Sequence, residues 1–165
     1  MGALLMAVRL ADTASAQGRP AVEPGPGRVR PADSKAAALL AAGVATSPTF
    51  KAIVESLDHS DLIVYVESRP LKLPGQLQLL AATPACRHVR VSIRTPGLDN
   101  ERIAWLAHEL WHGVELSRAP EVRDQAGLRR LYARIGRSDR YGDNAESAAA
   151  QEVWKKVLYE MQRAK

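Results

Sequence analysis

Two histidines and a glutamate in the middle of the chain have the spacing of a hydrolytic metal site. His108 and His112 are four residues apart, and Glu109 directly follows the first histidine. On an α-helix, residues four apart lie on one face, one turn above the other, so both imidazoles can reach one metal ion. Zinc suits imidazole ligands, and a nearby carboxylate can take a proton from a water molecule that the metal activates. The spacing therefore predicts Zn²⁺-assisted hydrolysis with Glu109 as the general base.

The surrounding residues favour a helix with one buried side. No proline interrupts residues 100–118, and Asp99 or Asn100 is placed to cap the start of the helix. Apolar residues recur at helical spacing; they are Ile103, Leu106, Leu110 and Val114. We therefore expect this helix to carry the two histidines inside the protein.

The stretch from His108 to His112 reads HELWH and resembles the active-site helix of the zincin metallopeptidases. Their extended pattern has uncharged flanks and an apolar residue two places after the second histidine, which Val114 supplies. The alternative is a chance match on a surface helix, but such a match usually carries charges or a helix breaker at the variable positions. The resemblance covers this helix and one later glutamate. It implies an α+β zincin-like fold, a bound Zn²⁺ and hydrolysis of peptide or protein substrates.

A catalytic zinc ion needs a third protein ligand besides the two histidines. Positions 115 and 118 hold glutamate and arginine, so the third histidine of the metzincins is absent. The resemblance is therefore to the gluzincins, in which a later glutamate completes the site. The candidates are Glu115, Glu121, Glu146 and Glu152.

Helical periodicity favours Glu146 as this third ligand. Glu115 would point along its own helix, and Glu121 is too close in sequence to fold back. If the last helix begins at Asn144, Glu146 falls on the buried stripe and Glu152 on the opposite side. A carboxylate on a buried stripe is costly unless something such as a metal pairs with it. The alternative is a capping box, in which Glu146 bonds only a backbone amide.

Stabilising an oxyanion during hydrolysis requires a further donor. The resemblance to gluzincins implies a tyrosine or a histidine in this role. Tyr141, in the polar loop before Glu146, is the predicted donor; Tyr132 and Arg140 are the alternatives.

Strand-like segments precede the motif helix and predict a small sheet. Residues 62–67, 76–82 and 88–95 are short and are separated by prolines and glycines. We expect them to form a three-stranded antiparallel meander packed against the motif helix and the C-terminal helices. Further helices are expected at residues 48–57, 120–135 and 144–163. The substrate cleft should lie between the motif helix and an exposed edge of strand 88–95.

The N-terminal part of the chain has a different composition from this domain. Residues 1–16 end in an A-x-A-like sequence, which predicts a signal peptide cleaved after Ala16 or a disordered tail. Residues 17–47 are rich in proline, glycine and alanine, which indicates a linker with a short helix over residues 34–42. The zincin-like domain is expected at residues 48–165. Export to the periplasm or medium follows from the signal peptide; without it the protein would be cytoplasmic.

Charge and cysteine content narrow the function classes. The 165 residues carry a formal net charge of +5, which favours anionic partners only weakly. Cys86 is the single cysteine, so an intrachain disulfide and a thiolate zinc cluster are excluded. No apolar run is long enough to span a bilayer, and nucleic acid is not expected as a partner. The competing hypothesis is a binding module, with or without a structural zinc, whose basic strands hold an acidic partner.

Overall fold

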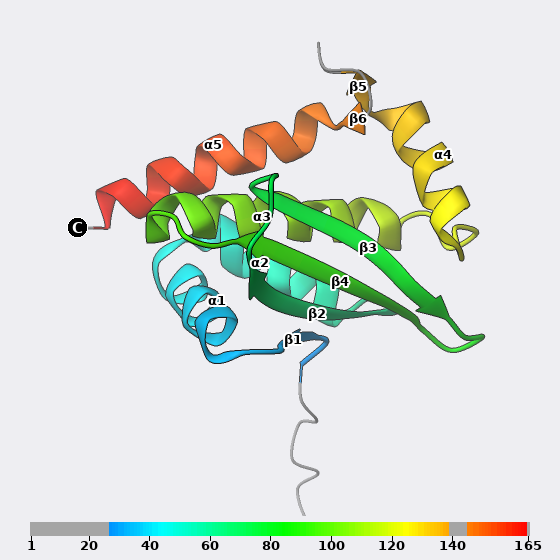
Figure 1. Cartoon of the computed structure of the whole chain (residues 1–165), viewed down its shortest axis with the longest axis horizontal. Helices are drawn as coiled ribbons and strands as arrows, with labels where there is room; N and C mark the ends of the chain where they lie inside the picture. Colours follow the sequence, from blue (N-terminus) through cyan, green and yellow to red (C-terminus); the bar gives the residue numbers. More distant parts are fainter. Residues whose placement is uncertain (1–26, 139–144, 165) are drawn as a thin grey trace, which may run out of the picture.

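The computed structural model describes residues 27–138 and 145–164 (Figure 1). The fold is α+β, with helices packed on a mixed sheet of four strands. The strands are β1 (Val29–Pro31), β2 (Leu62–Arg69), β3 (Gly75–Ala82) and β4 (Arg87–Arg94), in the order β1-β2-β4-β3. The predicted signal peptide lies outside the described residues.

The predicted three-stranded antiparallel meander is wrong. Strand β4 runs parallel to β2 and antiparallel to β3, and β1 adds a fourth strand parallel to β2. The central places go to the strands with the most buried branched residues; in β2 and β4 these are Val64, Val66, Val89, Val91 and Ile93. Strand β3 carries glutamines and alanines, and it takes the edge next to β4.

Residues 27–47 lie in the range predicted to be a linker, and they contribute to the folded core. Helix α1 (Ser34–Thr46) begins at Asp33, whose carboxylate accepts hydrogen bonds from the Ala36 and Ser68 amides. It continues through Gly43, past the predicted end at residue 42. A Cβ at Gly43 would lie 2.9 Å from the Phe50 ring, so glycine lets the next helix approach closely.

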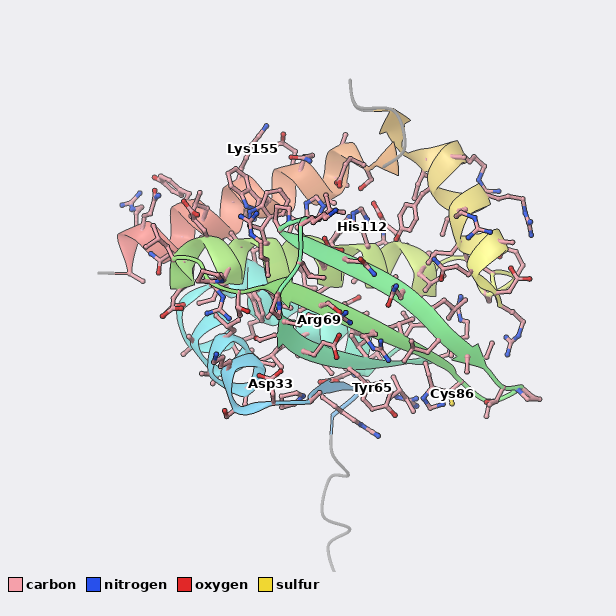
Figure 2. The ribbon with its side chains drawn as sticks, in the orientation of Figure 1. Asp33, Tyr65, Arg69, Cys86, His112 and Lys155 are labelled. Atoms are coloured by element: carbon pink, nitrogen blue, oxygen red, sulfur yellow. The ribbon has the colours of Figure 1, made fainter. Side chains whose placement is uncertain are left out.

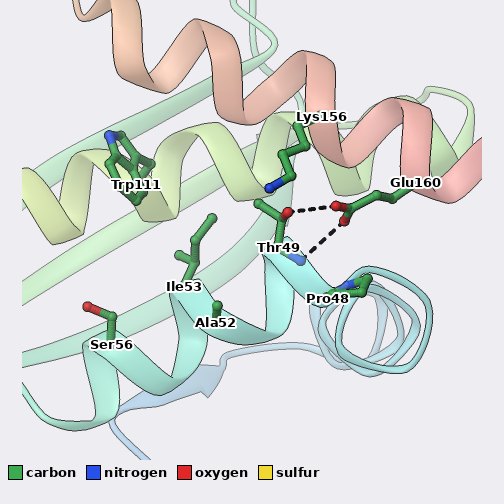
Figure 3. A pocket seen from close by; sticks show the side chains of 8 residues that line it. All are labelled: Pro48, Thr49, Ala52, Ile53, Ser56, Trp111, Lys156 and Glu160. Atoms are coloured by element: carbon green, nitrogen blue, oxygen red, sulfur yellow. Dashed lines mark hydrogen bonds between the residues drawn. The ribbon is translucent and has the colours of Figure 1, made fainter.

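Helix α2 (Pro48–Asp58) is held to the last helix, α5 (Ala148–Arg163), through its first turn. Ser47 caps α2 by accepting from the Phe50 amide, and Pro48 occupies the first position. Glu160 of α5 accepts hydrogen bonds from the Thr49 hydroxyl and amide (Figure 3). It also accepts a hydrogen bond from the Ser47 hydroxyl. These contacts border a groove of about 310 Å³ between α2, α5 and Trp111.

The motif helix α3 (Asp99–Ser117) is the central element of the fold. It packs on the sheet and along α5 (Figure 1). Its apolar residues Ile103, Leu106 and Leu110 are buried in the core, as predicted. Leu98 occupies the cap position without a side-chain hydrogen bond, so the predicted cap by Asp99 or Asn100 is not formed.

The C-terminal elements differ from their predicted bounds. Helix α4 (Gln125–Ile135) starts later than expected, and Asp124 caps it with a carboxylate that accepts a hydrogen bond from the Gly127 amide. A two-stranded ribbon follows, made of β5 (Arg137–Ser138) and β6 (Ala145–Glu146).

A buried arginine ties β4 to the segment that follows α3. The Arg87 side chain is fully buried and makes two hydrogen bonds to the Asp61 carboxylate, at 2.8 Å each. Its remaining nitrogen donates to the backbone carbonyls of Ala119 and Val122. These bonds fix the end of α3 relative to the sheet.

Replacing Arg87 with alanine should therefore destabilise the fold by about 3 kcal/mol. Loss of one partner of a buried ion pair costs about 3–5 kcal/mol, and the lower end applies because Asp61 keeps a third of its side chain exposed. Urea unfolding measures the change, with the exposed Arg94 on the same strand as control, whose change to alanine should cost within about 0.5 kcal/mol. Equal losses in the two variants would contradict the anchoring role.

Within the part of the chain that the structure describes, no single helix has the length and apolar character to cross a membrane. Helices α1 and α2 would qualify only as a pair, and they are bent by 115° relative to each other.

Candidate metal centre

Three side chains bring their ligand atoms together beside α3. His108 Nε2 lies 3.1 Å from His112 Nε2 and 2.8 Å from Glu146 Oε2, and His112 Nε2 lies 3.7 Å from the same oxygen. The histidines are buried, and the Glu146 side chain is one-third exposed. The structure thus brings together the three residues that the sequence predicts as ligands, and their atoms are placed as a group that could hold a metal ion.

The spacing of these atoms fits a tetrahedral zinc ion. Ligands about 2.0–2.1 Å from zinc lie about 3.3–3.4 Å from one another in a tetrahedron, and the three observed distances lie on either side of this value. Glu146 Oε2 is buried and has no hydrogen-bond partner among the described residues, although His108 Nε2 is 2.8 Å away. A buried carboxylate oxygen without a donor is costly, and a bound cation would satisfy it.

Glu146 reaches the site from a short strand, and the helix predicted to carry it begins two residues later. It belongs to β6, and Ser147 caps α5 by accepting a hydrogen bond from the Ala150 amide. The predicted helix start at Asn144 and the periodicity drawn from it are therefore wrong. The capping-box alternative fails as well, because Ser147 fills the cap and the Glu146 carboxylate lies beside His108 and His112.

The general-base candidate, Glu109, lies buried between α3 and β3. Its exposed fraction is 6%. A Cβ on Gly75 would lie 2.7 Å from both Cγ and Oε1 of Glu109, so only glycine leaves room for this carboxylate at the start of β3. The sequence signalled Gly75 only as part of a Pro-Gly chain break, and its role beside Glu109 was missed.

Burial and neighbouring charges shift the pKa values of the acids in opposite directions. Burial raises the pKa of Glu109 to about 7, although the two imidazoles oppose the shift. Burial also acts to raise the pKa of Glu146, but contacts with His108 and His112 outweigh it and hold this pKa well below the usual range. Near neutral pH, Glu146 is therefore an anion suited to bind a cation, and Glu109 can exchange a proton.

His112 is held on several sides by neighbouring groups. Its Nδ1 lies 2.8 Å from Glu115 Oε2, and its ring packs edge-on against the rings of His108 and Tyr132. The Tyr132 hydroxyl donates to the His112 carbonyl at 3.0 Å. Figure 2 labels His112 on α3. Glu115, one of the four candidates for the third ligand, therefore contacts His112 Nδ1 and not the Nε2 atom that lies beside His108. Tyr132 is engaged by this backbone bond, whereas Tyr141 and Arg140 lie outside the described residues.

If His112 is a zinc ligand, zinc affinity should rise with pH, because a proton competes with the metal for this imidazole. Burial lowers the pKa of His112, but the carboxylates of Glu115 and Glu146 outweigh it and raise this pKa to about 9. The metal-free protein therefore holds a proton on His112 below pH 9, and zinc must displace it. Competition with a chromophoric chelator should give an affinity that increases about tenfold per pH unit between about pH 7 and 8.5. A zinc affinity that stays constant over this pH interval would contradict the role of His112 as a zinc ligand.

No family model matches the chain, and comparisons with curated proteins and with solved structures find no similar protein.

Proposed function

We propose that the protein is a zinc-dependent peptide hydrolase of the zincin type. His108, His112 and Glu146 are the metal ligands, and Glu109 is the general base. The observation that carries the proposal is the convergence of the three proposed ligand atoms, at 2.8, 3.1 and 3.7 Å from one another, beside helix α3, which also carries the buried Glu109. If the HELWH sequence had arisen by chance, a third candidate ligand from a segment over 30 residues away would not be expected beside its two histidines.

The residues of the site divide the chemistry between them. A zinc ion held by the three ligands would act as a Lewis acid, lowering the pKa of a water molecule to about 7 and polarising the substrate carbonyl. Glu109 takes the proton of the attacking water and passes it to the leaving amine. Its pKa of about 7 suits both transfers, since a general base works best when its pKa is near the working pH.

The substrate strand is proposed to pair with β3. The predicted cleft requires an exposed edge on strand 88–95. This strand is β4, which has β2 on one side and β3 on the other, so neither of its edges is exposed. Strand β3 lies at the border of the sheet, and Gly75 at its start contacts Glu109. Gln125 of α4 accepts from the Leu79 amide, which occupies the far part of this edge. The edge before Leu79 is therefore the part on which an extended peptide would add as a strand.

The test is to purify the full chain, measure bound zinc after dialysis, and assay cleavage of casein and a mixed peptide library. We expect about one equivalent of zinc and cleavage that a chelator abolishes and added zinc restores. Zinc binding without cleavage of either substrate would contradict peptide hydrolysis and favour a zinc-stabilised binding module. Absence of zinc binding would contradict the metal centre.

A further inference from the structure

The two histidines of the metal centre differ in what holds their second nitrogen. His108 Nδ1 is buried and has no hydrogen-bond partner among the described residues. His112 Nδ1 is 2.8 Å from Glu115 Oε2. Metal-binding histidines usually donate this second N–H to a carboxylate or carbonyl, which fixes the tautomer and orientation of the ring and makes the ligand more basic. Among the residues that the structure describes, only His112 has such a partner.

Glu115 has no other ionic partner in the described part of the chain. Its side chain is 10% exposed, and its one ion pair is with His112. A buried carboxylate is stable only when it is paired, so contact with His112 accounts for this charge. The three-residue spacing on α3 places the two side chains on neighbouring positions of one helix face.

The geometry of His112 fixes which nitrogen faces the metal centre. The carboxylate of Glu115 can only accept a hydrogen bond when it is ionised, so Nδ1 carries the proton. The lone pair of neutral His112 is then on Nε2, the atom that lies 3.1 Å from His108 Nε2 and 3.7 Å from Glu146 Oε2. Tyr132 packs against the same ring and prevents it from turning freely.

We propose that Glu115 is a positioning residue that holds His112 as an Nε2 ligand and adds its negative charge to the metal centre. This inference rests on the proposed function, since it assumes that the three ligands bind zinc. It assigns to the sequence HELWHGVE a fourth functional position, three residues after the second histidine. Glu115 binds no metal itself and acts only through His112.

The experiment compares Glu115→Ala, Glu115→Gln and the control Glu101→Ala, which removes an exposed glutamate from the same helix. Zinc affinity is measured by chelator competition at about pH 9 and above, where a proton on His112 no longer competes with zinc, and unfolding of each metal-free variant is followed separately. We expect Glu115→Ala to weaken zinc binding about 10–100-fold, as for other outer partners of metal ligands. Glu115→Gln should recover part of this loss, because its amide oxygen still accepts from Nδ1. Glu101→Ala should bind zinc as the wild type does.

A spectroscopic measurement separates positioning from a purely structural role. In the zinc-loaded wild type, the proton on His112 Nδ1 should resonate far downfield because it is bonded to a carboxylate, and it should move upfield in Glu115→Ala. Unchanged zinc affinity and an unchanged resonance in Glu115→Ala would overturn the proposed role of Glu115. If the wild type still bound one equivalent of zinc, the proposed function would stand. A wild type that binds no zinc would overturn both.

Discussion

Glu109→Gln should retain one equivalent of zinc and lower kcat by about 10²–10⁴-fold, the range that loss of a general acid–base group produces. The amide has nearly the shape of the carboxylate but cannot accept the proton of the attacking water. Folding should be preserved, because Glu109 is buried beside Gly75 without an ion pair among the described residues and the neutral amide removes a charge that burial disfavours.

Steady-state kinetics on a peptide substrate, with zinc content measured on the same samples, tests this prediction. Glu101→Gln is the matched control, since it makes the same change on an exposed turn of α3 and should leave kcat unchanged. Normal turnover by Glu109→Gln would rule out the general-base role. Loss of zinc along with activity would instead make Glu109 part of the metal-binding structure.

Glu146→Ala should weaken zinc binding by more than about 100-fold, beyond the range for an outer partner of a ligand. Its Oε2 lies 2.8 Å and 3.7 Å from the two ligand nitrogens, so the change removes one of the three proposed ligand atoms. Glu152→Ala is the control: this side chain is 72% exposed on α5 and pairs only with Lys155 in the described residues.

Isothermal titration with zinc measures both variants. Glu146→Ala should lower the stability of the metal-free protein, because it removes the contacts with His108 and His112 that depress the Glu146 pKa, but it should leave the cap of α5 intact, because Ser147 provides it. Equal zinc affinity for Glu146→Ala and the wild type would contradict the three-ligand centre. A loss of affinity in Glu152→Ala would place the third ligand on α5.

Local features of the metal centre could be predicted from the sequence. The spacing of His108 and His112 requires only a helix, and apolar periodicity with no proline was enough to indicate one. The strands were found for the same reason, since β-branched runs such as residues 62–66 mark strands without reference to their neighbours.

Features set by the arrangement of distant segments could not be predicted. Glu146 was selected with a wrong helix start, because Ser147, and not Asn144, provides the cap. Periodicity cannot show that a residue just before a helix folds back over another helix. The order of β2, β4 and β3 depends on which strands are buried on which side, and the chain order alone suggested a meander. Gly75 matters only through its closeness to Glu109, which no local pattern reports.

The most direct test of the proposed metal centre is a crystal structure of the zinc-loaded protein with anomalous diffraction data collected at the zinc absorption edge. We predict one strong anomalous peak within about 2.0–2.2 Å of His108 Nε2, His112 Nε2 and a Glu146 carboxylate oxygen. No peak at this position, or a peak bound by other residues, would contradict the claim that these three side chains form the metal centre.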